Sequence, residues 1–129
     1  MQDLASAPRA DRLRAVVTEA ARSWRAARDG GLPAQPSLYC ALERSDCGLL
    51  APAFDSVMRL CERCLDRSMC VGCPLARASD ETLIGDLVAD PAQAQALFAC
   101  EAGHPSPLSQ AFICALRSTR IMLEETLAG

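Results

Sequence analysis

The chain has 129 residues, a length typical of a single folded domain with room for a hydrophobic core. Half of the residues are apolar, which excludes a disordered chain, and the formal net charge of −3 argues against a nucleic-acid partner. Few residues are aromatic and alanine is abundant, a composition that favours helices over sheet. We therefore expect one all-α domain over residues 1–129.

The cysteines and the N-terminal residues indicate in which cellular compartment the protein is expected. The chain contains eight cysteines, but its first residues lack the basic and apolar regions of a secretory signal. No apolar run is long enough for a transmembrane helix. Cysteines in a chain without an export signal indicate metal or redox chemistry in a reducing compartment. The sequence therefore predicts a cytoplasmic protein without a membrane partner.

The N-terminal part predicts a tail followed by a long helix. Residues 1–7 form a flexible tail, and apolar residues recur at helical spacing from Pro8 onwards. Gly30 and Gly31 are expected to end this helix, because glycine adopts the left-handed conformation of a helix C-terminus.

Six arginines lie along this predicted helix: Arg9, Arg12, Arg14, Arg22, Arg25 and Arg28. One interpretation is a solvated face whose arginines form ion pairs. The other is a docking surface for a protein partner with an acidic surface, to which Arg14, Arg22 and Arg25 contribute.

Two helices are predicted next. Residues 31–36 contain two prolines and are expected to form an extended linker, after which Ser37 caps a short helix over 38–44. A third helix starts near Pro52, and its apolar residues follow the i, i+3, i+4, i+7 pattern up to Leu65.

Three helices are predicted in the C-terminal half, each from a capping residue. Ser79 caps the fourth helix, Asp90 starts a fifth helix that ends near Ala102, and Ser106 starts the last. No segment has the alternation of a strand. The sequence thus predicts five or six helices, of which the first and the last are the longest.

The strongest chemical signal is a run of four cysteines. Cys61, Cys64, Cys70 and Cys73 follow the spacing C-x2-C-x5-C-x2-C, and a proline follows the last one. Two C-x2-C pairs supply the four thiolates that a tetrahedral zinc ion or a four-iron cluster needs. Packing of small thiols in a core is the alternative, but it does not explain four cysteines in so short a stretch. Residues 61–74 are therefore predicted to bind a metal centre.

The spacing favours an iron–sulfur cluster over zinc. Structural zinc sites usually separate their two pairs by about 12–20 residues, whereas five residues separate them here. Cys61 and Cys64 lie on the apolar face of the predicted third helix, with Cβ atoms about 5–6 Å apart. Cys73 is the first choice for the fourth ligand, and Cys47 or Cys40 are alternatives.

Four thiols lie outside this run: Cys40, Cys47, Cys100 and Cys114. Most of them are interpreted as core thiols, with a second centre held by them together as the alternative. His104 is interpreted as an exposed loop histidine. A metal pair or a Cys–His nucleophile formed by Cys100 and His104 is the alternative for those two residues.

The order C-x2-C-x5-C, here Cys61, Cys64 and Cys70, resembles the cysteine core of three iron–sulfur families. These are the WhiB-like regulators, the auxiliary clusters of SPASM-type radical enzymes, and the nitrogen-fixation protein that donates molybdenum. In the WhiB-like proteins a cysteine further upstream completes a four-iron cluster, which implies Cys40 or Cys47 for that role. The glycine-rich turn with tryptophan of that family is absent, and so is the CxxxCxxC loop of the radical enzymes. The resemblance therefore implies a cluster without implying an activity.

These observations predict a small [4Fe-4S] protein without enzymatic activity. It would act as an accessory, electron-transfer or cluster-sensing partner of a larger protein. The alternatives are a zinc-stapled interaction module, in which the metal supplies folding energy, and a thiol–disulfide redox switch. The sequence shows no Ser–His–Asp pattern and no glycine-rich phosphate loop.

Overall fold

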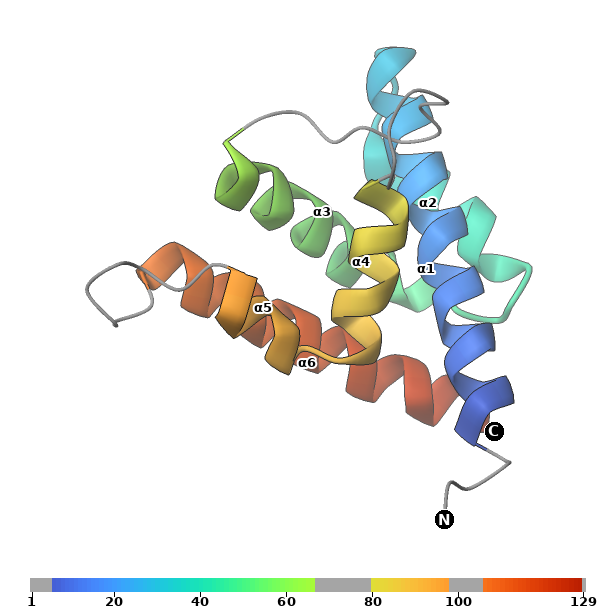
Figure 1. Ribbon diagram of the computed structural model, residues 1–129. Helices are drawn as coiled ribbons and strands as arrows, with labels where there is room; N and C mark the ends of the chain where they lie inside the picture. Colours follow the sequence, from blue (N-terminus) through green and yellow to red (C-terminus); the bar gives the residue numbers. More distant parts are fainter. Residues whose placement is uncertain (1–5, 67–79, 98–105, 129) are drawn as a thin grey trace.

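The computed structural model describes residues 6–66, 80–97 and 106–128. These ranges form six α-helices and a short 3-10 helix (Figure 1): α1 (Ser6–Asp29), α2 (Ala34–Glu43), η1 (Gly48–Leu50), α3 (Ala51–Leu65), α4 (Asp80–Ala89), α5 (Ala92–Leu97) and α6 (Pro107–Ala128). No strand occurs in the described ranges, so the predicted all-α class is confirmed. As predicted, the first and last helices are the longest of those described, with 24 and 22 residues.

The helices pack around one continuous hydrophobic core. Helix α1 contacts mainly α2 and α4, while α3 contacts α6 and α2. Figure 1 shows α1 running across the direction of α3 and α6. The largest fully buried side chains come from α1, α2, α3, α4 and α6: Trp24, Phe54, Phe112, Leu38, Leu42, Met58, Ile84, Leu87, Leu116, Leu123 and Val17.

The end of α1 follows the prediction, and its start does not. The amide of Leu32 donates to the carbonyl of Ala27 at 2.8 Å, and the amide of Gly31 donates to Arg28 at 3.1 Å. Together with the positive φ of Gly31, 68°, these bonds form a Schellman motif, which explains why a glycine stands there. The helix begins at Ser6, so the last two residues of the predicted tail are helical.

The predicted cap of the second helix is wrong. Helix α2 begins at Ala34, and Pro33 is its N-cap residue. Ser37 therefore lies inside the helix, where its hydroxyl donates to the carbonyl of Pro33 at 3.3 Å. The predicted linker is shorter than 31–36 because Pro36 falls in the first helical turn, where a backbone N–H has no intrahelical partner to lose.

Two other helix starts agree with the sequence. Helix α3 has a proline in its first turn, as the prediction near Pro52 requires. The amide of Ser109 donates to the Ser106 hydroxyl oxygen at 3.1 Å, which confirms Ser106 as the cap of α6. The predicted cap at Ser79 and the predicted end of the fifth helix at Ala102 lie outside the described residues.

A buried carboxylate joins three helices. Asp55 of α3 is only 6 % exposed, and its Oδ1 accepts hydrogen bonds of 2.9 Å from Trp24 Nε1 of α1 and from Arg59 Nε. Its Oδ2 accepts a bond of 3.2 Å from Gln35 of α2. Trp24 is fully buried, so its indole N–H depends on this acceptor. Asp55 thus fixes how α1, α2 and α3 meet.

Removing this carboxylate is expected to destabilise the fold strongly. In Asp55→Ala the indole N–H of Trp24 stays buried without an acceptor, a cost of about 1–3 kcal/mol. The loss of the ion pair adds little, because the Arg59 side chain is mostly exposed. Asp55→Asn keeps a carbonyl oxygen at this position and should cost less. Urea unfolding of both variants beside the wild type measures the difference, and equal losses would contradict the role assigned to the Trp24 bond.

The same carboxylate predicts a dependence of stability on pH. Burial by itself raises the pKa of Asp55, but the hydrogen bonds from Trp24, Arg59 and Gln35 outweigh it, so the pKa lies below the ordinary value of 3.8. A carboxyl whose pKa is lower in the folded state stabilises the fold above its unfolded pKa. This contribution is lost as the pH falls through the folded pKa.

Below about pH 4 the wild type should therefore lose free energy of unfolding more steeply than Asp55→Asn, which carries no carboxyl there. Urea titrations between about pH 5 and pH 2 provide the comparison. Parallel profiles for the two proteins would show that Asp55 is not a source of the acid sensitivity.

Candidate metal centre

The first cysteine pair of the run lies on the last two turns of α3. Cys61 is completely buried in the core, and Cys64, one turn later, is partly buried against it. Helix α3 packs along α6, and the Sγ of Cys64 lies 4.0 Å from the carbonyl oxygen of Leu108 at the start of α6. The two thiols therefore share the core-facing side of α3, at the i, i+3 spacing that suits two ligands of one centre.

Helix α3 ends directly after this pair. Asp66 is its C-cap residue and adopts the left-handed conformation, with φ 56° and ψ 37°, and its amide donates to the carbonyl of Arg63 at 3.3 Å. Aspartate tolerates this conformation better than most residues that carry a side chain. The helix therefore ends two residues after Cys64. Cys70 and Cys73 lie outside the described residues.

Burial raises the pKa of the Cys64 thiol above its ordinary value of 9.0. Without a metal the thiol is therefore neutral at pH 7. Metals bind the thiolate, so loading of this site would release a proton. The described donors of the site fit a soft metal or an iron–sulfur cluster, for which thiolate sulfur is the preferred ligand.

Cys47 has a structural role elsewhere in the molecule. Its amide donates to the carbonyl of Leu42 at 2.9 Å, and Asp46, with a φ of 59°, donates to Glu43 at 3.1 Å, so α2 ends in a second Schellman motif. The Cys47 side chain is only 1 % exposed, and its Sγ donates to the carbonyl of Ser45 at 3.2 Å. Burial raises the pKa of this thiol as well. It closes α2 as a small core residue.

The other alternative ligand, Cys40, is exposed on α2. The described residues contain no group of three or more His, Cys, Asp or Glu side chains that could hold a metal ion, so neither Cys40 nor Cys47 joins Cys61 and Cys64 in such a group. Cys114 is exposed on α6, so of the three outlying thiols that the structure describes only Cys47 is a core thiol, whereas most were predicted to be. Cys100 and His104 lie outside the described residues.

The three arginines that the sequence predicts as a docking surface form ion pairs within the chain. Arg14 pairs with Asp86 of α4 at 3.2 Å, and Arg22 pairs with the buried Glu81 of α4 at 2.5 Å. In its own helix, Arg25 pairs with Asp29 at 3.2 Å. Two of the three therefore hold α1 against α4.

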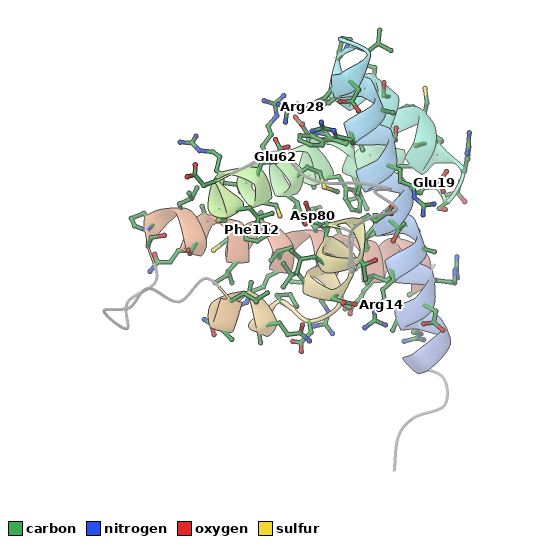
Figure 2. The ribbon with its side chains drawn as sticks, turned by 45° about the horizontal axis from the view of Figure 1, so that its top comes forward. Arg14, Glu19, Arg28, Glu62, Asp80 and Phe112 are labelled. Atoms are coloured by element: carbon green, nitrogen blue, oxygen red, sulfur yellow. The ribbon has the colours of Figure 1, made fainter. Side chains whose placement is uncertain are left out.

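A second polar cluster, which the sequence patterns do not predict, anchors the end of α3. Glu62, which directly follows Cys61, accepts from Arg28 of α1, and Arg25 lies 3.9 Å from the same carboxylate. Figure 2 shows Arg28 and Glu62 side by side. The Arg28 guanidinium also covers the Trp24 ring, 4.9 Å from its centre, a cation–π contact. The one feature of the sequence that could have indicated this cluster is the acidic residue Glu62 between Cys61 and Cys64.

Comparisons of the chain with protein-family models, with curated proteins and with solved structures gave no match. The local resemblance to iron–sulfur families stays a prediction. None of the described helices combines the length and the apolar character that a membrane span requires.

Two cysteine variants separate a packing role from a ligand role. Cys47→Ala removes a buried sulfur and should lower the free energy of unfolding by about 1 kcal/mol. Cys40→Ala changes an exposed side chain and should stay within about 0.5 kcal/mol of the wild type. Chemical unfolding, with iron and zinc analysis of the same samples, provides the measurement. Loss of bound metal in Cys47→Ala would make it a ligand instead.

Proposed function

We propose that this chain is a small all-α iron–sulfur protein in which Cys61, Cys64, Cys70 and Cys73 hold a four-iron cluster. The main support is the cysteine run itself, together with the position of its first pair at the end of α3. A four-iron cluster takes one protein ligand per iron, and thiolates are its usual ligands. A helix end followed by a turn is suited to supply two ligands, with two more from the segment that follows.

The packing of the described residues favours this proposal over a zinc-stapled module. Where zinc staples a domain, metal binding supplies the folding energy that a small core lacks. Here a continuous core extends over α1, α2, α3, α4, α5 and α6. Every buried side-chain nitrogen and oxygen of the described residues also has a hydrogen-bond partner. A domain with such a core has less need of a metal for folding. We therefore propose that the centre serves electron transfer or sensing rather than stabilisation of the fold.

The proposed role is that of a cytoplasmic accessory, electron-transfer or cluster-sensing partner of a larger protein. Cys64 is only partly buried, and it lies next to the end of α3. A cluster held there would lie at the edge of the core, where electrons or oxidants can reach it. A thiol–disulfide switch would use the same cysteines without iron, and metal content separates the two functions.

The decisive measurement is metal analysis of protein purified without oxygen. We expect iron and acid-labile sulfide in about four equivalents each per chain, with broad absorption near about 400 nm. Cys64→Ser should lose most of the iron, whereas Cys114→Ser, which changes an exposed cysteine on α6, should keep it. A Cys64→Ser protein with its full metal content would refute the site.

Removal of the metal tests the alternative in the same samples. A chelator should bleach the protein while circular dichroism keeps most of its helical signal, because the described helices already share one continuous apolar core. Cooperative loss of helix on chelation, with zinc in place of iron, would support the zinc-stapled module.

A further inference from the structure

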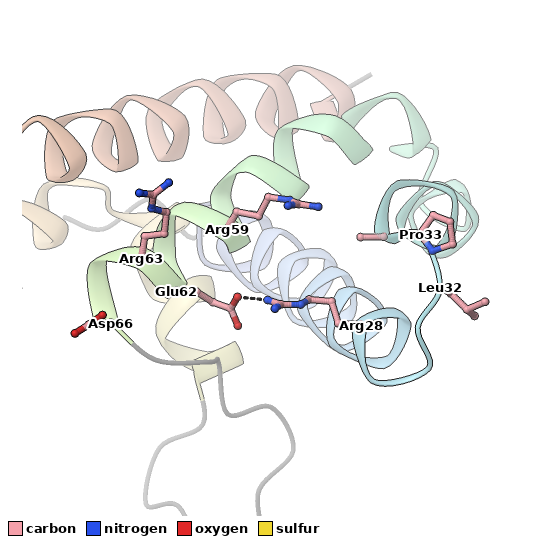
Figure 3. Close-up of a pocket in the computed structure, with 8 residues that line it drawn as sticks. Arg28, Leu32, Pro33, Arg59, Glu62, Arg63 and Asp66 are labelled. Carbon is pink, nitrogen blue, oxygen red and sulfur yellow. Dashed lines mark hydrogen bonds and ion pairs between the residues drawn. The ribbon is translucent and has the colours of Figure 1, made fainter.

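A groove lies beside the candidate metal centre, between the second half of α3 and the corner that joins α1 to α2 (Figure 3). It has a volume of about 700 Å³, and its lining consists of Arg28, Leu32, Pro33, Ala34, Arg59, Glu62, Arg63 and Asp66. Three of these eight residues are arginines. The groove is independent of the arginine surface predicted from the sequence, because Arg14, Arg22 and Arg25 are not among its lining residues.

The three arginines differ in how far the chain already uses them. Arg28 is held by Glu62 and by the Trp24 ring. Arg59 uses its Nε for Asp55 and keeps 67 % of its side chain exposed, so its two terminal nitrogens point to solvent-accessible space. Arg63 is exposed, and its side chain forms no ion pair within the described part of the chain. Arg59 and Arg63 therefore offer guanidinium donors for an anionic ligand.

The other charges of the groove limit what this ligand can be. Glu62 pairs with Arg28 and Arg25, whereas Asp66 lines the groove without an ion pair to the described residues. The chain as a whole carries a net charge of −3, which opposes a long polyanion such as a nucleic acid. On the other side of the groove, Leu32 is 62 % exposed next to Pro33. An apolar side beside the unpaired guanidinium of Arg63 and the terminal nitrogens of Arg59 fits a peptide that carries both carboxylates and an apolar side chain.

We propose that this groove binds an acidic peptide segment of a partner protein. Its carboxylates pair with Arg59 and Arg63, and an apolar side chain packs against Leu32 and Pro33. This inference gives the accessory role under "Proposed function" a docking surface and rests on that role for its purpose. The groove itself does not depend on the cluster. It also places the partner on the last turns of α3, next to the cysteine pair.

The test uses the full chain and a synthetic hexapeptide of glutamate and leucine, acetyl-Glu-Leu-Glu-Glu-Leu-Glu-amide. Nitrogen–proton correlation spectra of the labelled protein are recorded during titration with this peptide. We expect saturable shifts at Leu32, Arg59 and Arg63, and weaker binding at higher salt because exposed charges are screened over about 10 Å at 0.1 M. The same peptide with glutamine for glutamate should not bind.

Matched variants make the result specific. Arg63→Glu should weaken the peptide by about tenfold, because it replaces a charge-assisted bond by a repulsion. Leu32→Ala should weaken it without changing charge. Arg117→Glu makes the same charge change at another exposed arginine, on α6, and should have little effect. Iron and zinc content is measured in every sample, so that loss of the cluster is not mistaken for loss of the groove.

Three results would overturn the proposal. The first is a set of shifts spread over exposed arginines in general, with Arg117→Glu as harmful as Arg63→Glu. The second is absence of saturable binding in protein whose metal content is intact. The third is preferential binding of a single-stranded oligonucleotide or of anionic vesicles at the same residues, because either would assign the groove to another class of partner.

Discussion

The structure depends on one buried hydrogen bond, from the indole of Trp24 to the carboxylate of Asp55. A buried carboxylate is costly unless several donors surround it, and here donors come from α1, α2 and α3 itself. The Trp24 ring also carries the Arg28 guanidinium on its face, and Arg28 in turn binds Glu62. Asp55 and Glu62 are seven residues apart and so lie on the same side of α3. One tryptophan therefore holds α3 at two points, two turns apart, and sets the position of the helix end that carries Cys61 and Cys64.

Local sequence signals predicted the local features of the fold. Apolar spacing located the helices, Gly31 marked the end of α1, and Ser106 marked the start of α6. Ser37 misled because two signals competed: a serine that can cap, and a proline just before it that is equally compatible with the first turn of a helix. The bond between Trp24 and Asp55 joins residues 31 positions apart. No local pattern predicts such a long-range partner. The only hints in the sequence are a single tryptophan, whose indole N–H needs an acceptor when it is buried, and an aspartate next to Phe54.

The candidate centre shows the same division between local and long-range information. The spacing of Cys61 and Cys64 predicts that they lie one turn apart on α3, because helix geometry alone fixes that relation. Spacing cannot separate a ligand thiol from a core thiol, since cysteine serves both roles with the same small side chain. Burial and backbone bonds make the distinction for Cys47: it closes a Schellman motif, with its thiol bonded to Ser45. For Cys40 and Cys114, exposure is a property of the tertiary fold and has no counterpart in the sequence.

The end of α3 keeps two kinds of chemistry on opposite sides of one helix. At 100° per residue, Cys61 and Cys64 fall on the side that faces the core and α6, whereas Arg59 and Arg63 fall on the side that lines the groove. A helix with its side chains is about 10–12 Å across. A partner in the groove would therefore lie within roughly that distance of the cysteine pair, without covering the thiols. The ion pairs of Arg14 and Arg22 with α4 have a different role, because they hold α1 against α4 within the fold. On α3, Arg63 forms no ion pair with the described residues, and Arg59 uses only its Nε for Asp55. These two guanidinium groups can therefore still donate to another molecule close to the proposed cluster.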